Sequence, residues 1–250
     1  MLWPYHCPAQ QIADKSLSAG ITLSDGKIKD ESMSALAYQG FYPGVQVAYR
    51  IDKYNFQQNI TMGIAGGKLN NRDNGTSLSV KSYRINYSGL IPVIKTEIFR
   101  INAGVVFDNY LAVRRHDHYI NNKDFFEFNS SVGLAANLCY NFGRADDYTG
   151  GKFRLITGIS APLLTAMSRS NDINNRISDF QSPTLKTYIK NINWLSFNGY
   201  TRYNWLTEFK RTAGRNAVSL SYQWDYYHIK QDYQVHSVIS TIALNYYLTL

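Results

Sequence analysis

The last eighteen residues of the sequence, Tyr233 to Leu250, follow one uninterrupted two-residue alternation. One face carries Ser240 and six large apolar residues, namely Val238, Ile242, Leu244, Tyr246, Leu248 and Leu250. The other face mixes polar, small and aromatic residues, namely Thr241, Ala243, Asn245 and Tyr247. This pattern predicts a strand whose two faces meet different surroundings. Because chain ends usually fray, a long strand that uses the last residue favours a transmembrane β-barrel closed by that strand.

Nine other segments show the same alternation, and ten strands suit one barrel domain of 250 residues. The clearest internal example has Phe128 and Leu134 on one face against Glu127 and Asn137 on the other. The ten expected strands lie at about 16–24, 44–54, 58–67, 77–89, 96–113, 126–142, 152–161, 193–210, 216–229 and 233–250. Twelve strands are the alternative if 29–42 or 162–192 hides a further pair.

The composition is compatible with a membrane barrel and excludes a transmembrane helix. Aromatic residues make up 14% of the chain, and charged residues make up 18%, below the ~25% typical of soluble domains. No run of 18 apolar residues occurs, so no helix is expected to span a bilayer. The mean hydropathy of −0.32 does not contradict a barrel, because half of each strand faces a polar lumen.

Three features favour an outward apolar face over the inward one of a soluble barrel. Aromatic residues flank the apolar face of one strand, with Phe126 and Phe128 at one end and Tyr140 and Phe142 at the other. Charged residues of both signs occupy the opposite faces of the strands. The outer connections, expected near 25–43, 68–76, 114–124, 162–192 and 230–233, are mostly longer than the inner ones near 54–57, 90–95, 143–151 and 211–215.

Ten charged residues are expected to face the lumen and to pair across it, namely Arg50, Asp52, Arg84, Arg100, Asp108, Glu127, Arg154, Arg202, Glu208 and Asp225. We favour a structural role for this network, since buried charges are costly unless paired. A narrow channel that prefers anions is the alternative, because five of the residues are arginines.

The alternating segments and the ending Leu244 to Leu250 resemble those of small bacterial outer-membrane β-barrel proteins. The richness in Tyr and Asn, and the pair Ala9-Gln10 at a possible signal cleavage point, resemble Bacteroidota in style, with no specific protein matched. Many such barrels end in Phe, and Leu250 departs from that habit. The resemblance implies a barrel over 16–250, with 1–15 as a tail or signal-peptide remnant. It also implies a bacterial outer-membrane location, contact with lipid and lipopolysaccharide, and insertion by the barrel-assembly machinery.

The stretch from Arg114 to His118 is the most concentrated polar sequence and is expected in an outer loop. His116 and His118 are spaced to ligate a metal, and His228 is expected near the same rim. A histidine with Asp117, Asp225 or Asp232 could instead activate water, as in the ten-stranded omptin proteases, whose sites lie at the extracellular rim. We favour a hydrated loop that contacts lipopolysaccharide phosphates or nothing.

Other functional signals are weak. Gly-x-Ser-x-Gly is absent, Cys7 and Cys139 give no reason to pair, and the net charge of +8 is scattered, with no cluster longer than Arg114-Arg115. We therefore expect no bound cofactor or metal and no nucleic-acid partner. The leading hypothesis is a non-enzymatic structural or accessory component of an envelope complex, with other envelope proteins as expected partners. The alternatives are a rim-site protease or lipid hydrolase and the narrow channel.

Overall fold

The computed structural model describes residues 14–53, 55–96, 98–116, 124–142, 152–169, 192–231 and 233–250. Candidate residues Asp117, His118 and Asp232, together with Cys7 and most of the tail at 1–15, lie outside these ranges. Within these ranges the regular elements are all strands, namely β1 (Asp14–Asp30), β2 (Ala37–Lys53), β3 (Phe56–Asn70), β4 (Ser77–Lys95), β5 (Phe99–His116), β6 (Asp124–Phe142), β7 (Lys152–Arg169), β8 (Asn193–Ser196), β9 (Tyr200–Ala213), β10 (Asn216–Ile229) and β11 (Val235–Thr249). In this part of the chain no helix is long and apolar enough to span a membrane.

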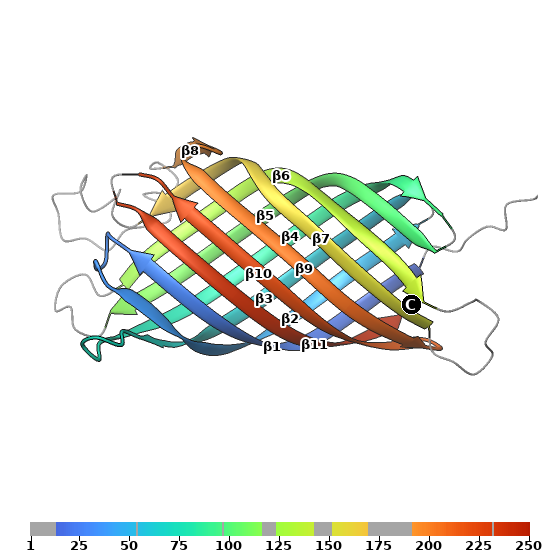
Figure 1. The fold of residues 1–250 in the computed structure, drawn as a ribbon, viewed down its shortest axis with the longest axis horizontal. Coiled ribbons are helices and arrows are strands. Elements are labelled where there is room, and N and C mark those ends of the chain that lie inside the picture. Colours follow the sequence, from blue (N-terminus) through green and yellow to red (C-terminus); the bar gives the residue numbers. More distant parts are fainter. Residues whose placement is uncertain are drawn as a thin grey trace, which may run out of the picture.

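Ten of the strands close into one antiparallel up-and-down barrel (Figure 1). Neighbours in the chain pair in order from β1 to β7, β7 continues to β9, and β11 closes the ring on β1. The closing contact is long, running from Ser16 opposite Thr249 to Asp30 opposite Val235. The expected ten-stranded barrel is confirmed, and β8 is an additional short strand paired with β7.

The two ends of the barrel differ in their connections. At the end that holds Leu250, hereafter the terminal end, pairing continues to the tips of several hairpins, as in Lys53 opposite Phe56. The β9–β10 hairpin turns through Gly214, whose φ of 60° suits a residue without a Cβ. At the other end, hereafter the loop end, residues 31–36 and 71–76 join β1 to β2 and β3 to β4. The strands are longer than expected, so much of the region 25–43 is strand rather than loop.

The expected strand at 193–210 is interrupted. β8 ends at Ser196, and a turn through Phe197 and Gly199 precedes β9, with the Gly199 amide donating to the Ser196 carbonyl at 2.9 Å. β8 pairs with β7 at Leu164–Met167, whereas β9 pairs with β7 only as far as Ser160. The alternation continues across 193–210, so it does not reveal that the two halves of this segment pair with different stretches of β7.

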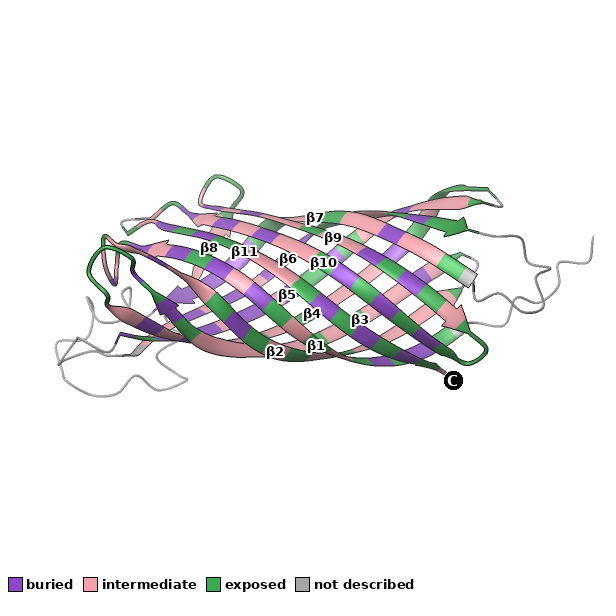
Figure 2. Cartoon of the chain, turned by 60° about the horizontal axis from the view of Figure 1, so that its bottom comes forward, coloured by how far each residue is buried: buried purple, intermediate pink, exposed green. Residues whose placement is uncertain are grey.

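Burial alternates along the strands because successive side chains point to opposite faces (Figure 2). The apolar parity set of β11 is exposed on the outer surface, whereas Ala243, Asn245 and Tyr247 are buried in the lumen. The outward face therefore matches the prediction made from the last eighteen residues.

An uncharged band surrounds the outer surface. On β1 the outward residues between Lys15 and Asp25 are Leu17, Ala19, Ile21 and Leu23. Crossing a bilayer takes ~9–11 residues of a tilted strand, which fits this spacing. Near the terminal end, Tyr140, Phe142, Phe153 and Phe209 form a chain of ring contacts. Toward the loop end, Trp224 stacks on Tyr226. The two aromatic groups lie where interfacial girdles would.

A packed apolar cluster fills the loop-end part of the lumen. It contains Ile28, Met33, Tyr38, Tyr42, Leu69, Leu78, Val80, Met167, Tyr200, Tyr227, Ile229 and Val235. Gly26 makes room for it, because a Cβ there would lie 2.8 Å from the Tyr42 ring. This end of the barrel therefore has a core of its own, as small barrels do when side chains fill the interior.

Candidate functional site in the barrel lumen

The lumen is built in layers that can be followed along β5. From the terminal end to the loop end, its inward residues include Arg100, Asn102, Asp108, Tyr110 and Arg114. Each charged residue in this series belongs to a different ion-pair group. Because alternate residues of β5 point inward, this one strand contributes a charged residue to each of three successive layers of the lumen.

The central cluster consists of Arg84, Asp108, Arg202 and Asp225, from four strands. Arg84 contacts Asp108 at 2.7 Å and Asp225 at 2.9 Å. Arg202 contacts Asp108 at 2.7 Å and also pairs with Asp225. Each guanidinium therefore binds both carboxylates, and two positive charges balance two negative ones. The Arg202 guanidinium also lies over the rings of Tyr110 and Tyr227.

The loop-side cage consists of Asp30, Arg114, Glu127 and Arg169. Arg114 donates from Nη1 to Glu127 at 2.8 Å and to Asp30 at 3.2 Å, and Arg169 donates to Asp30 at 2.8 Å. The Arg114 Nη2 group donates to the Tyr227 hydroxyl at 2.6 Å. All four side chains are buried, and each of them has an oppositely charged partner within the cage.

The floor cluster lies toward the terminal end and consists of Asp52, Arg100 and Arg154. Asp52 accepts from Arg100 at 2.7 Å and from Arg154 at 3.3 Å. Next to it, three amides bond to one another, with Asn102 donating to Asn137 at 2.6 Å and Asn137 donating to Gln57 at 3.0 Å. Among the side chains that the structure describes, this layer thus has two guanidinium groups for one carboxylate.

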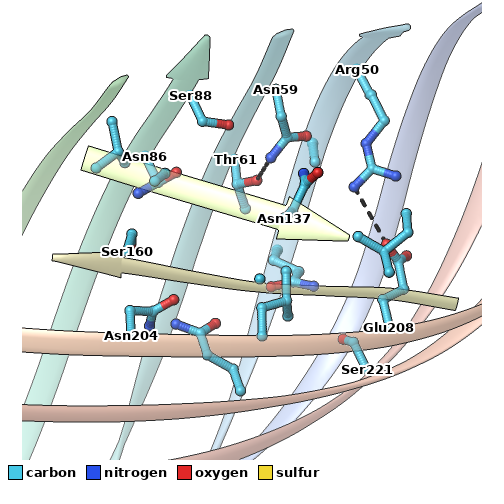
Figure 3. A pocket seen from close by; sticks show the side chains of 18 of the residues that line it. Arg50, Asn59, Thr61, Asn86, Ser88, Asn137, Ser160, Asn204, Glu208 and Ser221 are labelled. Atoms are coloured by element: carbon cyan, nitrogen blue, oxygen red, sulfur yellow. Dashed lines mark hydrogen bonds and ion pairs between the residues drawn. The ribbon is translucent and has the colours of Figure 1, made fainter. Parts of the chain in front are cut away.

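A polar cavity of about 220 Å³ extends from the floor amides Gln57 and Asn137 to Arg84 of the central cluster. Figure 3 shows part of its lining. Arg50 and Glu208 form an ion pair in its wall at 3.3 Å. Glu208 also accepts a hydrogen bond from the Tyr247 hydroxyl. The remaining polar lining is mostly amide and hydroxyl groups, among them Asn59, Thr61, Asn86, Ser88, Asn137, Ser160, Asn204, Ser221, Gln223 and Asn245.

The structure places all ten residues of the expected lumen network on inward faces. Nine of them pair within the set, in the Arg50–Glu208 pair, the central cluster and the floor cluster. Glu127 instead pairs with Arg114, a residue assigned to an outer loop by the sequence. Sequence reasoning missed Asp30, Arg114 and Arg169. The parity of β1 and β5 would have pointed Asp30 and Arg114 inward had the strands been extended.

The two histidines of the rim-site hypothesis that the structure describes do not come together. His116 is buried on the inward face of β5, where its Nε2 lies 2.7 Å from the Tyr38 hydroxyl. His228 is on the outward face of β10 and stacks on His236, with ring centroids 4.1 Å apart. Asp225 is inward and belongs to the central cluster, so it faces away from His228.

Two further kinds of side chain in the described residues are the metal-ligating groups and the thiol of Cys139. They contain no group of three or more His, Cys, Asp or Glu residues arranged to hold a metal ion. Cys139 is free and buried beside Asn102, with its sulfur 3.8 Å from Nδ2. It contributes to the amide floor rather than to an accessible nucleophilic site.

Comparisons with known proteins bear on the fold. No protein-family model matches the sequence, and no curated protein matches it either. Among solved structures, the chain is similar to the outer-membrane protease OmpT from Escherichia coli, with a TM-score of 0.52 and 6% identity over 97% of this chain and 98% of that one. It also aligns with the transport unit of the autotransporter AIDA-I from Escherichia coli, with a TM-score of 0.46 and 10% identity over 100% and 94% of the two chains. At such identities the likeness to OmpT establishes a shared fold, which is that of an outer-membrane β-barrel.

Proposed function

We propose that this chain is an integral protein of the bacterial outer membrane with a non-enzymatic, structural or accessory role in an envelope complex. The observation that carries the proposal is the way in which the lumen charges are used. In the loop-side cage and the central cluster, four arginines and four carboxylates bind one another across the barrel. These ion pairs link strands on different sides of the barrel, and their charged groups bind one another rather than lining an open channel.

The outer surface supports the membrane part of the proposal. Large apolar residues are exposed around the barrel, among them Ile21, Val45, Ile64, Val105, Leu134, Ile159, Leu220 and Leu244. Exposed apolar surface on this scale indicates contact with a membrane or with a partner protein. A lipid bilayer suits it, because closure of the barrel leaves no unpaired strand edge in the hydrocarbon. Lipopolysaccharide and the barrel-assembly machinery are then the expected lipid and insertion partners.

Planar-bilayer recording separates the structural role from the channel alternative. The loop-end apolar cluster and the two ion-paired layers predict no stable conductance for the purified, folded protein. Persistent anion-selective steps would support the channel instead. The variant Arg202→Ala, which removes one guanidinium of the central cluster, serves as a comparison, because any leak through this layer should grow when the layer is weakened.

A complementation experiment tests the non-enzymatic role. A strain that lacks the protein is expected to show an envelope defect, such as sensitivity to detergent. The chain with His116→Ala and His228→Ala should restore resistance as fully as the wild type when both are present at equal levels in the outer membrane. Loss of rescue at equal folded amounts would instead support rim-site chemistry.

A further inference from the structure

We propose that the lumen cavity binds a small organic anion, with a carboxylate or phosphate group held by Arg50 and a hydroxylated body held by the surrounding amides. This inference goes beyond the proposed structural role. It rests on three features of the cavity, which are the donors of Arg50, the local charge and the polar lining.

Arg50 has more buried donors than the protein uses. Its Nη2 group donates to Glu208 Oε2 at 3.3 Å, which is a long bond for an ion pair. Its Nε and Nη1 atoms are buried and have no acceptor on the protein. A buried donor without an acceptor is costly, and a guanidinium presents its N–H groups in a fixed plane. Nε and Nη1 lie on different edges of that plane, each beside Nη2, so one carboxylate or phosphate group would satisfy one of the two unpaired groups while its second oxygen accepts from Nη2.

Charge on the terminal-end side of the cavity also favours an anion. Among the described side chains there, the floor cluster has two guanidinium groups and one carboxylate. Lys210 adds a further ammonium group, 4.2 Å from the centroid of the Tyr247 ring. Glu208, the one carboxylate among the described residues of the cavity wall, is already shared between Arg50 and Tyr247. An anionic ligand would therefore enter a region of positive potential.

The rest of the lining suits a hydroxylated molecule. Amide side chains both donate and accept hydrogen bonds, so they can bind hydroxyl groups in either sense. Asn204 lies far from Arg50 in the view of Figure 3, and its Nδ2 group is a second buried donor without a protein acceptor. A volume of about 220 Å³ is below the ~300–1,000 Å³ of pockets for drug-sized ligands, which limits the ligand to a small molecule.

Calorimetric titration of the folded protein in detergent tests the proposal. Gluconate is the probe, because it joins a carboxylate to a hydroxylated chain. Two controls each lack one half of gluconate: glucose has hydroxyl groups but no charge, and acetate has a carboxylate but no hydroxyl groups. Glucose 6-phosphate and inorganic phosphate test whether a phosphate group can replace the carboxylate. We expect gluconate or glucose 6-phosphate to bind at least tenfold more tightly than glucose, acetate or inorganic phosphate.

Variants locate the binding to the cavity. Arg50→Lys keeps the charge but loses the planar fork and should weaken binding at least tenfold. The pair Arg50→Gln with Glu208→Gln avoids an unpaired buried carboxylate and should abolish binding. Asn204→Ala, which leaves the ion pair intact, should weaken binding several-fold. Arg211→Gln, at an exposed arginine on the outer face of β9, is the matched control and should bind as the wild type does.

Two results would overturn the proposal. One is the absence of heat from both hydroxylated anions at millimolar concentration with folded wild-type protein. The other is unchanged affinity in a folded Arg50→Lys or Asn204→Ala variant. Both results concern the isolated protein and are independent of the complementation and conductance experiments, so the structural role can fail or stand separately.

Discussion

The Arg114 guanidinium donates from Nη1 to Glu127 Oε2 at 2.8 Å, and the two side chains are only 2% and 1% exposed. Removing one partner of such a pair leaves a buried charge uncompensated, which typically costs ~3–5 kcal/mol. We therefore expect Glu127→Gln to lower the free energy of unfolding by about this amount, as measured by urea titration in detergent micelles.

The matched control for this pair is Glu31→Gln. Glu31 pairs with Lys29 at 3.5 Å, and both side chains are exposed at the loop end. An exposed pair of this kind contributes ~0–1 kcal/mol, so the change should be almost neutral. Equal effects of Glu127→Gln and Glu31→Gln would contradict the assignment of the loop-side cage as a structural element.

The inward orientation of Arg114 also shows what the sequence could and could not predict. Alternation defined the two faces of each strand, because a period of two follows from backbone geometry alone. Strand ends were harder to predict, because polar residues at the loop end resemble a hydrated loop although they face a buried cage. The sequence pattern therefore predicts a loop for Arg114-Arg115-His116, whereas this segment continues β5.

The inward position of Arg169 and the cavity at Arg50 could not be predicted from the sequence for a different reason. A register irregularity at Val132 and Gly133, opposite Leu164 and Pro162, changes which parity of β7 faces inward. Arg154 and Arg169 consequently both face the lumen, although they differ in parity. The cavity at Arg50 depends on side-chain lengths from many strands, and a single-strand pattern carries no such information. The positions of the lumen charges were thus predictable, whereas their partners across the barrel were not.

The outward position of Leu134 gives a test of the membrane band. Leu134 is 56% exposed near the middle of β6, so Leu134→Arg places a charge in the hydrocarbon. The expected cost is ~2–4 kcal/mol when unfolding is measured in lipid bilayers. Ser240→Arg is the matched control, because Ser240 pairs with Asp25 at the edge of the band, where the cost falls to ~0–1 kcal/mol. Similar costs at both positions would mean that the band is misplaced.

His116 and Tyr38 give a test of the role of this histidine. Their 2.7 Å contact is buried among the loop-end residues of the lumen. His116→Ala should lower the free energy of unfolding by ~1–3 kcal/mol, because it removes a partner of the Tyr38 hydroxyl. In a double-mutant cycle with Tyr38→Phe, the two changes should be coupled by ~0.5–3 kcal/mol. Strict additivity would show that the contact does not contribute to stability.

Replacing Gly133 by a larger residue should destabilise the barrel. A Cβ there would lie 2.7 Å from the Cα of Pro162 and closer still to the carbonyl oxygen of Ala161, and both are backbone atoms that cannot rotate away. Overpacking of this kind costs ~1–3 kcal/mol, so Gly133→Ala should destabilise the barrel by that amount in urea titration. Gly63→Ala is the control within the same lumen, because the nearest atom to its Cβ would be 3.7 Å away. An alanine there is expected to stabilise by up to ~1 kcal/mol through reduced chain entropy. If the two alanines instead changed the free energy of unfolding equally, β6 and β7 would not approach each other as closely at the irregularity as the structure shows.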